Sequence, residues 1–238
     1  MLYTTEAIVL NNYPYGEADL IVVYFTKEYG VLNLFAKSPR KIKSRFGSSL
    51  EPLTYSKVAF IGREDRLQRI IQSDIIESFY KIRENFNLFK KIAEILRFII
   101  QISPKKEANP KLFLTFTETL FQIKESNTPD KYLLYLKIAI LKSLGYLPDF
   151  LYCGVCAKKL NGVFYYSEGF PLCKECLKKE GKEFRSFSKN IAQLITSFSN
   201  WDVRYLKRVH LPESLTQAVE RFIDSHIQTI LSYNKIKL

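Results

Sequence analysis

All four cysteines of the chain lie in one short segment, and their arrangement constrains the fold more than any other feature. They form two Cys-x-x-Cys pairs, Cys153 with Cys156 and Cys173 with Cys176, and 16 residues separate the pairs. Two residues between the members of a pair let both sulfurs turn toward one ion. A second pair at this distance can complete a tetrahedron of four thiolates, which is the coordination that structural Zn²⁺ prefers. We therefore predict a structural zinc site.

Other uses of four cysteines fit the sequence less well. Disulfides need an oxidising compartment, and the N-terminus MLYTTEAIVLNNY lacks the basic and apolar regions of a signal peptide. A redox Cys-x-x-Cys is expected once and in a thioredoxin-like context, which is missing. An iron–sulfur cluster also uses four cysteines, but nothing else indicates electron transfer. Four sulfur ligands leave no position for water, so we do not expect a catalytic metal.

The first 80 residues have the pattern of β-strands. Apolar and polar side chains alternate, or β-branched runs occur, in five segments separated by short connections. These segments are residues 2–13, 17–30, 30–38, 55–62 and 66–79. Five strands in so short a length are typical of an OB-fold barrel. A small open sheet or an SH3-like barrel fits the same pattern.

Beyond residue 80 the apolar residues recur every three or four positions, which indicates helices. We expect helices near residues 86–102, 110–123, 130–144, 187–198 and 212–233. The fold class is therefore α+β: an N-terminal five-stranded OB-fold barrel, followed by an all-α domain that carries the four-cysteine zinc element. The expected divisions are residues 1–80 for the barrel, 81–150 and 186–238 for the helical domain, and 151–185 for the zinc element.

Positive charge is unevenly distributed. The formal net charge is +12, and a balance of this size suggests a polyanion such as nucleic acid as the partner, although a solvated basic surface is the simpler explanation. Residues 1–80 hold ten basic and nine acidic residues, but half of the basic ones lie in the segment KSPRKIKSR. We predict that this basic loop contacts the nucleic-acid backbone. Its basic residues are Lys37, Arg40, Lys41, Lys43 and Arg45.

Five aromatic residues near the basic loop in the sequence have two readings. They can pack in the barrel core, which is the commoner role of such residues, or an exposed ring can stack on a base. These residues are Tyr24, Phe25, Tyr29, Phe35 and Phe46.

The sequence gives little support for catalysis. It holds two histidines, His210 and His226, both far from the cysteines in sequence, and it lacks phosphate-loop, Gly-x-Ser-x-Gly and His-Glu-x-x-His motifs. No run of 18 apolar residues indicates a membrane span. We expect a non-enzymatic, cytoplasmic and nucleoid-associated protein with no membrane or small-molecule substrate.

Three segments, in this order, resemble the RecO family of bacterial recombination mediators over nearly the whole chain. YGEADLIVVYFTKEYGVLNLFAKSPRKIKSR resembles the family's opening, with a Gly-Glu-x-Asp turn and a hairpin that leads into a basic loop. LKSLGYLPDFLYCGVC resembles a helix end that enters the first zinc knuckle. FYYSEGFPLCKEC resembles the stretch that closes the second knuckle.

The resemblance implies a fold and a function. It implies an OB-fold and a helical domain with a zinc element that supports the fold. It also implies that the protein binds single- and double-stranded DNA and anneals complementary strands. Together with RecR, such a protein helps RecA to load onto DNA that is covered by single-stranded DNA-binding protein. That protein's acidic, apolar-ended tail would need an apolar pocket with a basic rim. The basic loop matches the family's DNA-binding loop and the four cysteines match its metal ligands.

Two other functions remain open at the level of sequence. A zinc-ribbon RNA-binding or ribosome-associated protein would bind RNA more strongly than DNA and would not anneal strands. A protein-interaction scaffold with incidental charge would bind DNA weakly and independently of the basic loop.

Overall fold

The computed structural model describes residues 1–41, 44–63, 65–161, 163–180 and 184–236. By its internal contacts the chain divides into two compact units, residues 1–126 and 127–238. The first unit therefore contains the barrel and three helices that follow it, whereas the sequence-based division falls at residue 80. Among the described residues no helix is long and apolar enough to cross a membrane.

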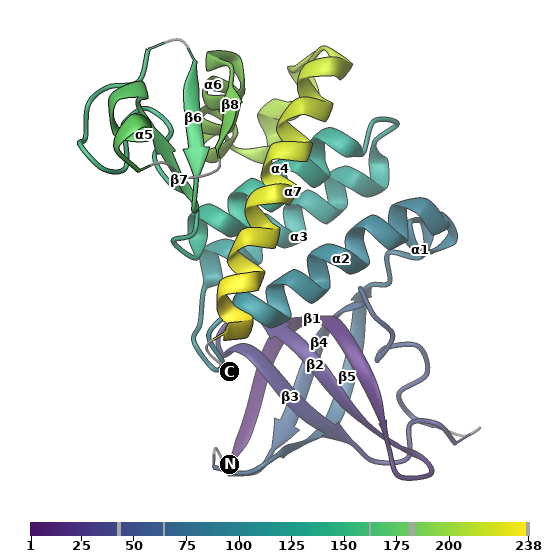
Figure 1. The fold of residues 1–238 in the computed structure, drawn as a ribbon. Coiled ribbons are helices and arrows are strands. Elements are labelled where there is room, and N and C mark those ends of the chain that lie inside the picture. Colours follow the sequence, from purple (N-terminus) through teal and green to yellow (C-terminus); the bar gives the residue numbers. More distant parts are fainter. Residues whose placement is uncertain (42–43, 64, 162, 181–183, 237–238) are drawn as a thin grey trace. The chain divides into compact units, whose positions relative to one another are not determined.

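Five strands of the first unit close into a barrel, as the sequence predicts (Figure 1). Neighbouring strands pair antiparallel in the order β1-β2-β3 and β5-β4-β1, and a short parallel pairing of β3 with β5 closes the ring. Closure excludes the open sheet. The strands are β1 Leu2–Tyr15, β2 Asp19–Thr26, β3 Gly30–Ala36, β4 Tyr55–Ile61 and β5 Gln68–Glu77.

The barrel core follows from the alternation of side chains along the strands. Inward positions are buried in one continuous cluster, to which the long β3–β4 connection adds Phe46 and Leu50. The same connection is bonded to β1, because the backbone N–H of Leu53 donates to the carbonyl oxygen of Val9 at 2.8 Å. The strands contribute Ala7, Val9, Val22, Tyr24, Leu32, Leu34, Ala36, Val58, Phe60 and Ile70.

The three helices of the first unit are α1 (Tyr80–Glu84), α2 (Phe86–Ile102) and α3 (Pro110–Glu125). Asparagines cap the two long ones: Asn85 Oδ1 accepts from the N–H of Leu88 at 3.1 Å, and Asn109 Oδ1 accepts from the N–H of Leu112 at 3.0 Å. Both helices agree with the expected ranges, whereas the short α1 was not predicted.

The second unit contains helices around the cysteine segment. α4 (Asp130–Ser143), α6 (Lys189–Asn200) and α7 (Glu213–Ile236) lie within two residues of the predicted helix starts. A 3₁₀ helix, η1 (Val203–Arg208), separates the last two. In the cysteine segment, β6 (Phe164–Ser167) and β7 (Phe170–Leu172) form the expected hairpin, and β8 (Arg185–Phe187) adds a third strand beside β6.

Candidate nucleic-acid interface and metal centre

The four cysteines come together from two turns of different kinds. In the first, the N–H of Cys153 donates to the carbonyl of Lys158 at 2.9 Å, and the N–H of Ala157 donates back to the carbonyl of Cys153 at 2.9 Å. In the second, Cys173 directly precedes α5 (Lys174–Glu180), so Cys176 lies in the first turn of that helix. The β6–β7 hairpin joins the two turns and brings them face to face.

The positions of the sulfur atoms fit a tetrahedral zinc ion. All four Sγ atoms lie within 4.8 Å of one another, and Cys156 Sγ is 3.8 Å from Cys173 Sγ. Zn–S bonds of about 2.3 Å in a tetrahedron place the sulfurs about 3.8 Å apart. The predicted ligand set therefore forms a possible metal site with the right donor atoms and spacing.

The backbone around the sulfurs favours thiolates. The N–H of Cys173 points at Cys153 Sγ at 3.4 Å, and the N–H of Cys176 points at Cys173 Sγ at 3.5 Å. Burial acts to raise the pKa of Cys153, but the backbone N–H groups of Cys156, Cys173 and Val155 outweigh it and lower the pKa to about 6. Hydrogen bonding with Cys156 instead raises the pKa of Cys176. A divalent cation would stabilise all four thiolates together.

One glycine makes the first turn possible. Gly154 donates its N–H to the carbonyl of Pro171 on β7 at 2.8 Å. A Cβ at position 154 would lie 2.9 Å from the Cβ of Phe170. Only a residue without a side chain lets the turn approach the hairpin this closely, so Gly154 helps to set the distance between the two cysteine pairs.

The cysteine segment is joined to the helices of the second unit by aromatic packing. Phe187 on β8 packs edge-to-face on Phe222 of α7, with ring centroids 4.4 Å apart. Tyr166 on β6 also contacts Phe222, at 4.9 Å, and its hydroxyl meets Nδ1 of His226. A metal that orders the segment therefore also orders the surface on which α7 packs.

The predicted basic loop lies in the β3–β4 connection, at the barrel end that carries the β1–β2 turn. The N–H of Arg40 donates to the carbonyl of Ala18 at 3.2 Å, and the N–H of Ser38 donates to Asp19 Oδ1 at 2.6 Å. These two bonds attach the loop to the turn. The four described basic residues, Lys37, Arg40, Lys41 and Arg45, are exposed. The fifth, Lys43, lies outside the described residues.

Arg45 is held in place more firmly than a solvated arginine. Its guanidinium lies 4.9 Å from the ring centroid of Phe46 and donates a long hydrogen bond of 3.4 Å to the carbonyl of Ile70. Phe46 itself is buried in the barrel core. Among the four described basic residues of the loop, Arg45 is therefore the one for which such contacts are found.

The five aromatic residues near the basic loop in the sequence differ in burial, so they do not all have the same role. Tyr24, Phe25 and Phe46 are buried in the core, whereas Tyr29 and Phe35 are half-buried. Sequence reasoning missed Tyr13 and Tyr15, which are 48% and 54% exposed near the β1–β2 turn. Both tyrosines fit the alternation of β1, so the pattern did not distinguish them from core residues. The turn sequence Tyr-Pro-Tyr-Gly was the signal that could have indicated their exposure.

The chain is similar to known proteins over both units. The family profile described as "Recombination protein O N terminal" matches residues 1–79, and "Recombination protein O C terminal" matches residues 90–237. A DNA repair protein RecO of Thermodesulfovibrio yellowstonii is 54% identical over 239 residues, which is 99% of this chain and 96% of the relative. RecO of Dehalococcoides mccartyi strain CBDB1 is 34% identical over 73% of this chain and 70% of the relative. RecO of Bacillus subtilis is 28% identical over 96% and 89%.

Proposed function

Because this chain belongs to the RecO family of DNA repair proteins, we propose that it is a recombination mediator. It binds single- and double-stranded DNA, anneals complementary strands and, with RecR, helps RecA load onto single-stranded DNA covered by single-stranded DNA-binding protein. It does this in the cytoplasm, on nucleoid DNA, and its work is binding without chemical turnover. The observation that carries the proposal is the exposed basic loop beside exposed tyrosines at one end of the barrel.

The charge of this barrel end explains how annealing would be promoted. Two DNA strands repel each other as polyanions, and cations that bind phosphates release counterions and lower this repulsion. Lys37, Arg40, Lys41, Lys43 and Arg45 supply the cations. Exposed rings at Tyr13 and Tyr15 offer sequence-tolerant stacking surfaces for unpaired bases. Affinity should then depend on salt and little on sequence.

The zinc ion has a structural role in this proposal. Cys153, Cys156, Cys173 and Cys176 would hold it in a closed coordination sphere with no position for a substrate. The β6–β7 hairpin and β8 pack on α7 through Phe187 and Tyr166. Zinc therefore maintains a surface of the helical unit, and the basic loop contacts DNA.

The acidic, apolar-ended tail of single-stranded DNA-binding protein has a matching surface in the second unit. A hollow of about 280 Å³ is lined by Trp201, Tyr205, Arg208 and Val209. Arg208 is exposed and has no ion-pair partner among the described residues. An apolar floor beside an arginine is the chemistry that such a tail requires. The partnership with RecR rests on the family alone.

Strand annealing tests the proposal. Two complementary labelled oligonucleotides would be followed by fluorescence quenching, at low and moderate salt, with and without single-stranded DNA-binding protein. A variant with Lys37, Arg40 and Lys41 changed to Ala is compared with one in which Lys178, Lys179 and Lys189, all exposed in the second unit, are changed to Ala. Both lose three charges, so only the position of the charge differs.

We expect fast annealing by the wild type and by the second-unit variant, and slow annealing by the loop variant. Equal rates for both variants would remove the basic loop from the mechanism. No annealing by the wild type would count against mediator function. Stronger binding to RNA than to DNA of the same sequence would then favour the RNA-binding alternative.

A further inference from the structure

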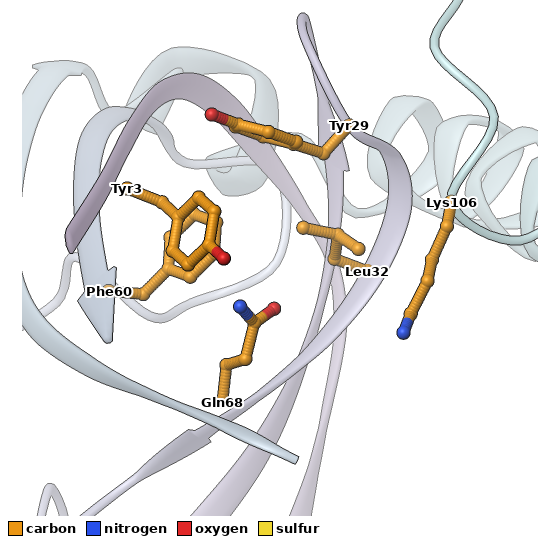
Figure 2. Close-up of a pocket in the computed structure, with 6 residues that line it drawn as sticks. All are labelled: Tyr3, Tyr29, Leu32, Phe60, Gln68 and Lys106. Carbon is orange, nitrogen blue, oxygen red and sulfur yellow. The ribbon is translucent and has the colours of Figure 1, made fainter. Parts of the chain in front are cut away.

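A second candidate site lies on the barrel and is lined by residues outside the basic loop. The β2–β3 turn, the start of β1 and the start of β5 surround a cavity of about 120 Å³ there, shown in Figure 2. The cavity and the basic loop both meet β5: Gln68 lines the cavity, and the Arg45 guanidinium of the loop donates to the carbonyl of Ile70, two residues along the strand. The lining residues are Tyr3, Tyr29, Leu32, Phe60, Gln68 and Lys106.

Aromatic rings form one wall of this cavity. Tyr3 and Phe60 are stacked, with centroids 5.2 Å apart and planes inclined by 12°. Tyr29 meets both edge-on, at 5.8 Å from Tyr3 and 5.7 Å from Phe60. A cavity of roughly 150 Å³ is enough to hold a benzene molecule. The space here, about 120 Å³, is somewhat smaller but opens to solvent, so one planar ring can enter it in part while its substituents stay outside.

One buried polar group faces this aromatic wall. Gln68 is only 7% exposed, and Figure 2 shows its amide directed into the cavity toward Tyr3 and Phe60. Within the described part of the chain, no hydrogen bond is found for that amide. Because the amide lines an open cavity, its partner there is water or a ligand. Gln68 thus offers a donor and an acceptor to a ligand in the cavity.

Positive charge lies at the rim and is held there by the backbone. The N–H of Lys106 donates to the carbonyl of Val31 at 3.3 Å. The α2–α3 connection approaches so closely that a Cβ at Gly30 would lie 2.1 Å from the carbonyl oxygen of Glu107. Arg66 and Arg69, both exposed, flank Gln68 along the chain. Among the described residues that line the cavity, Lys106 is the one cation, so a phosphate next to a bound ring is expected outside the cavity, beside Lys106.

We propose that this cavity holds one unpaired base of a DNA strand. The base lies against the aromatic wall and bonds the Gln68 amide through its Watson–Crick edge, while Lys106 faces the adjoining phosphate. The inference rests on the proposed function, because it assumes that the chain binds single-stranded DNA. It adds a base-binding site to the basic loop, which is proposed to bind the DNA backbone.

This geometry selects the unpaired state, and its hydrogen bonds alone do not select a sequence. The Watson–Crick edge of every base carries a donor beside an acceptor, and a glutamine amide presents both and can turn over to match either order. In a duplex the same edge is occupied by the complementary base. The cavity therefore binds a base before pairing and loses it when the complementary strand arrives, as an annealing protein requires.

Photocrosslinking tests the site directly. An oligothymidylate with one 5-iodo-2′-deoxyuridine, which crosslinks to aromatic rings in contact with it, is irradiated with the full-length protein. The oligonucleotide is used single-stranded and annealed to its complement, and crosslinked peptides are identified by mass spectrometry. Overall affinity is measured in parallel by fluorescence anisotropy. Gln68→Leu removes the amide at similar volume, and Gln72→Leu, an exposed glutamine of the same strand, is the matched control.

We expect crosslinks at Tyr3, Tyr29 or Phe60 with the single strand and loss of these crosslinks with the duplex. Gln68→Leu should lower their yield about fivefold, the equivalent of one net hydrogen bond, while Gln72→Leu leaves it unchanged. If Gln68→Leu fails to fold, the crosslink yield of Tyr29→Leu, a change at a half-buried turn position, is measured instead. Crosslinks confined to other peptides, or equal yields from single strand and duplex, would overturn this site and leave mediator function standing. Failure of the wild type to bind single-stranded DNA would overturn both.

Discussion

Nε2 of His226 lies 2.7 Å from the carbonyl oxygen of Tyr146, and this contact fixes the protonation of a buried histidine. A carbonyl only accepts, so Nε2 carries the proton and Nδ1 accepts from the Tyr166 hydroxyl. One imidazole thereby joins α7, the segment after α4 and strand β6 of the cysteine segment. His226 is 2% exposed, so both bonds are shielded from water.

The buried histidine predicts a pH dependence of stability. Burial lowers the pKa of His226 below 6.5, and the Tyr146 carbonyl opposes this shift only partly. The unfolded chain therefore binds a proton at a higher pH than the folded chain does. Neutral His226 therefore contributes to the free energy of unfolding in full above pH 6.5. This contribution falls as the pH drops below 6.5 and is lost once the pH has passed the folded-state pKa of His226.

Urea unfolding of wild type and His226→Gln at pH 7.5 and 5.5 measures this contribution. The variant should be about 1–3 kcal/mol less stable at pH 7.5, because one buried hydroxyl or carbonyl loses its partner. The difference between the two proteins should shrink at pH 5.5. A constant difference at the two pH values would show that the titration of His226 does not contribute.

Removal of the metal should destabilise the second unit selectively. We expect about one zinc per chain by elemental analysis, and none after Cys153→Ser with Cys156→Ser. If free zinc exceeds its dissociation constant a thousandfold, its removal costs about 4 kcal/mol. Hydrogen exchange should increase in β6, β7 and α7 but not in the barrel strands. Unchanged exchange in α7 would disprove a supporting role for the ion.

An ion pair within the first unit gives an acid-sensitive contact. Lys124 Nζ on α3 lies 2.6 Å from Glu77 Oε2 at the end of β5. Burial acts to raise the pKa of Glu77, but the hydrogen bond and charge of Lys124, together with the backbone N–H groups of Phe79 and Ser78, outweigh it and the pKa is lowered. The folded-state pKa is below the unfolded value, so this stabilisation is present above about pH 4.5 and is lost as the pH falls through the folded-state pKa.

The matching experiment is acid unfolding of the wild type and Glu77→Gln. The variant should be less stable at pH 7 and should lose less of its stability between pH 5 and pH 3. Gln72→Leu on the same strand serves as a surface control. A variant with the same acid dependence as the wild type would mean that Glu77 is equally paired in the unfolded chain.

The salt dependence of DNA binding should show how many phosphates the basic loop contacts. Each phosphate contact to a single strand adds about −0.7 to the slope of log affinity against log salt concentration. If Lys37, Arg40 and Lys41 each make one contact, their change to Ala should reduce the slope by about 2. Fluorescence anisotropy with a labelled oligonucleotide between 50 and 300 mM salt provides the slope. A lower affinity with an unchanged slope would indicate a folding defect instead.

Local patterns were enough to predict most of the fold. Alternation along β1 to β5, and caps such as Asn109-Pro110, depend on neighbouring residues and could be read directly. The Cys-x-x-Cys pairs could be read for the same reason, because their geometry is set by short turns. The short α1 could not, since its five residues hold a single buried side chain, Ile82, and give no period.

Features that depend on distant contacts were beyond the sequence. Gln68 looks like any polar residue at a strand start, and only closure of the barrel buries it beside Tyr3 and Phe60. The two hydrogen bonds of His226 could not be predicted, because its partners lie 60 and 80 residues away in the sequence. The exposure of Tyr13 and Tyr15 depends on where β1 leaves the barrel, which alternation does not reveal.

The parallel pairing of β3 with β5 has a consequence for synthesis on the ribosome. β1 emerges first, but its second partner, β4, begins only at Tyr55, and the ring closes only when β5, from Gln68 to Glu77, has emerged. Until then β3 and β4 expose unpaired edges that can pair with other nascent chains. Translation pauses or truncations before residue 77 are therefore the ones from which aggregation of this chain is expected.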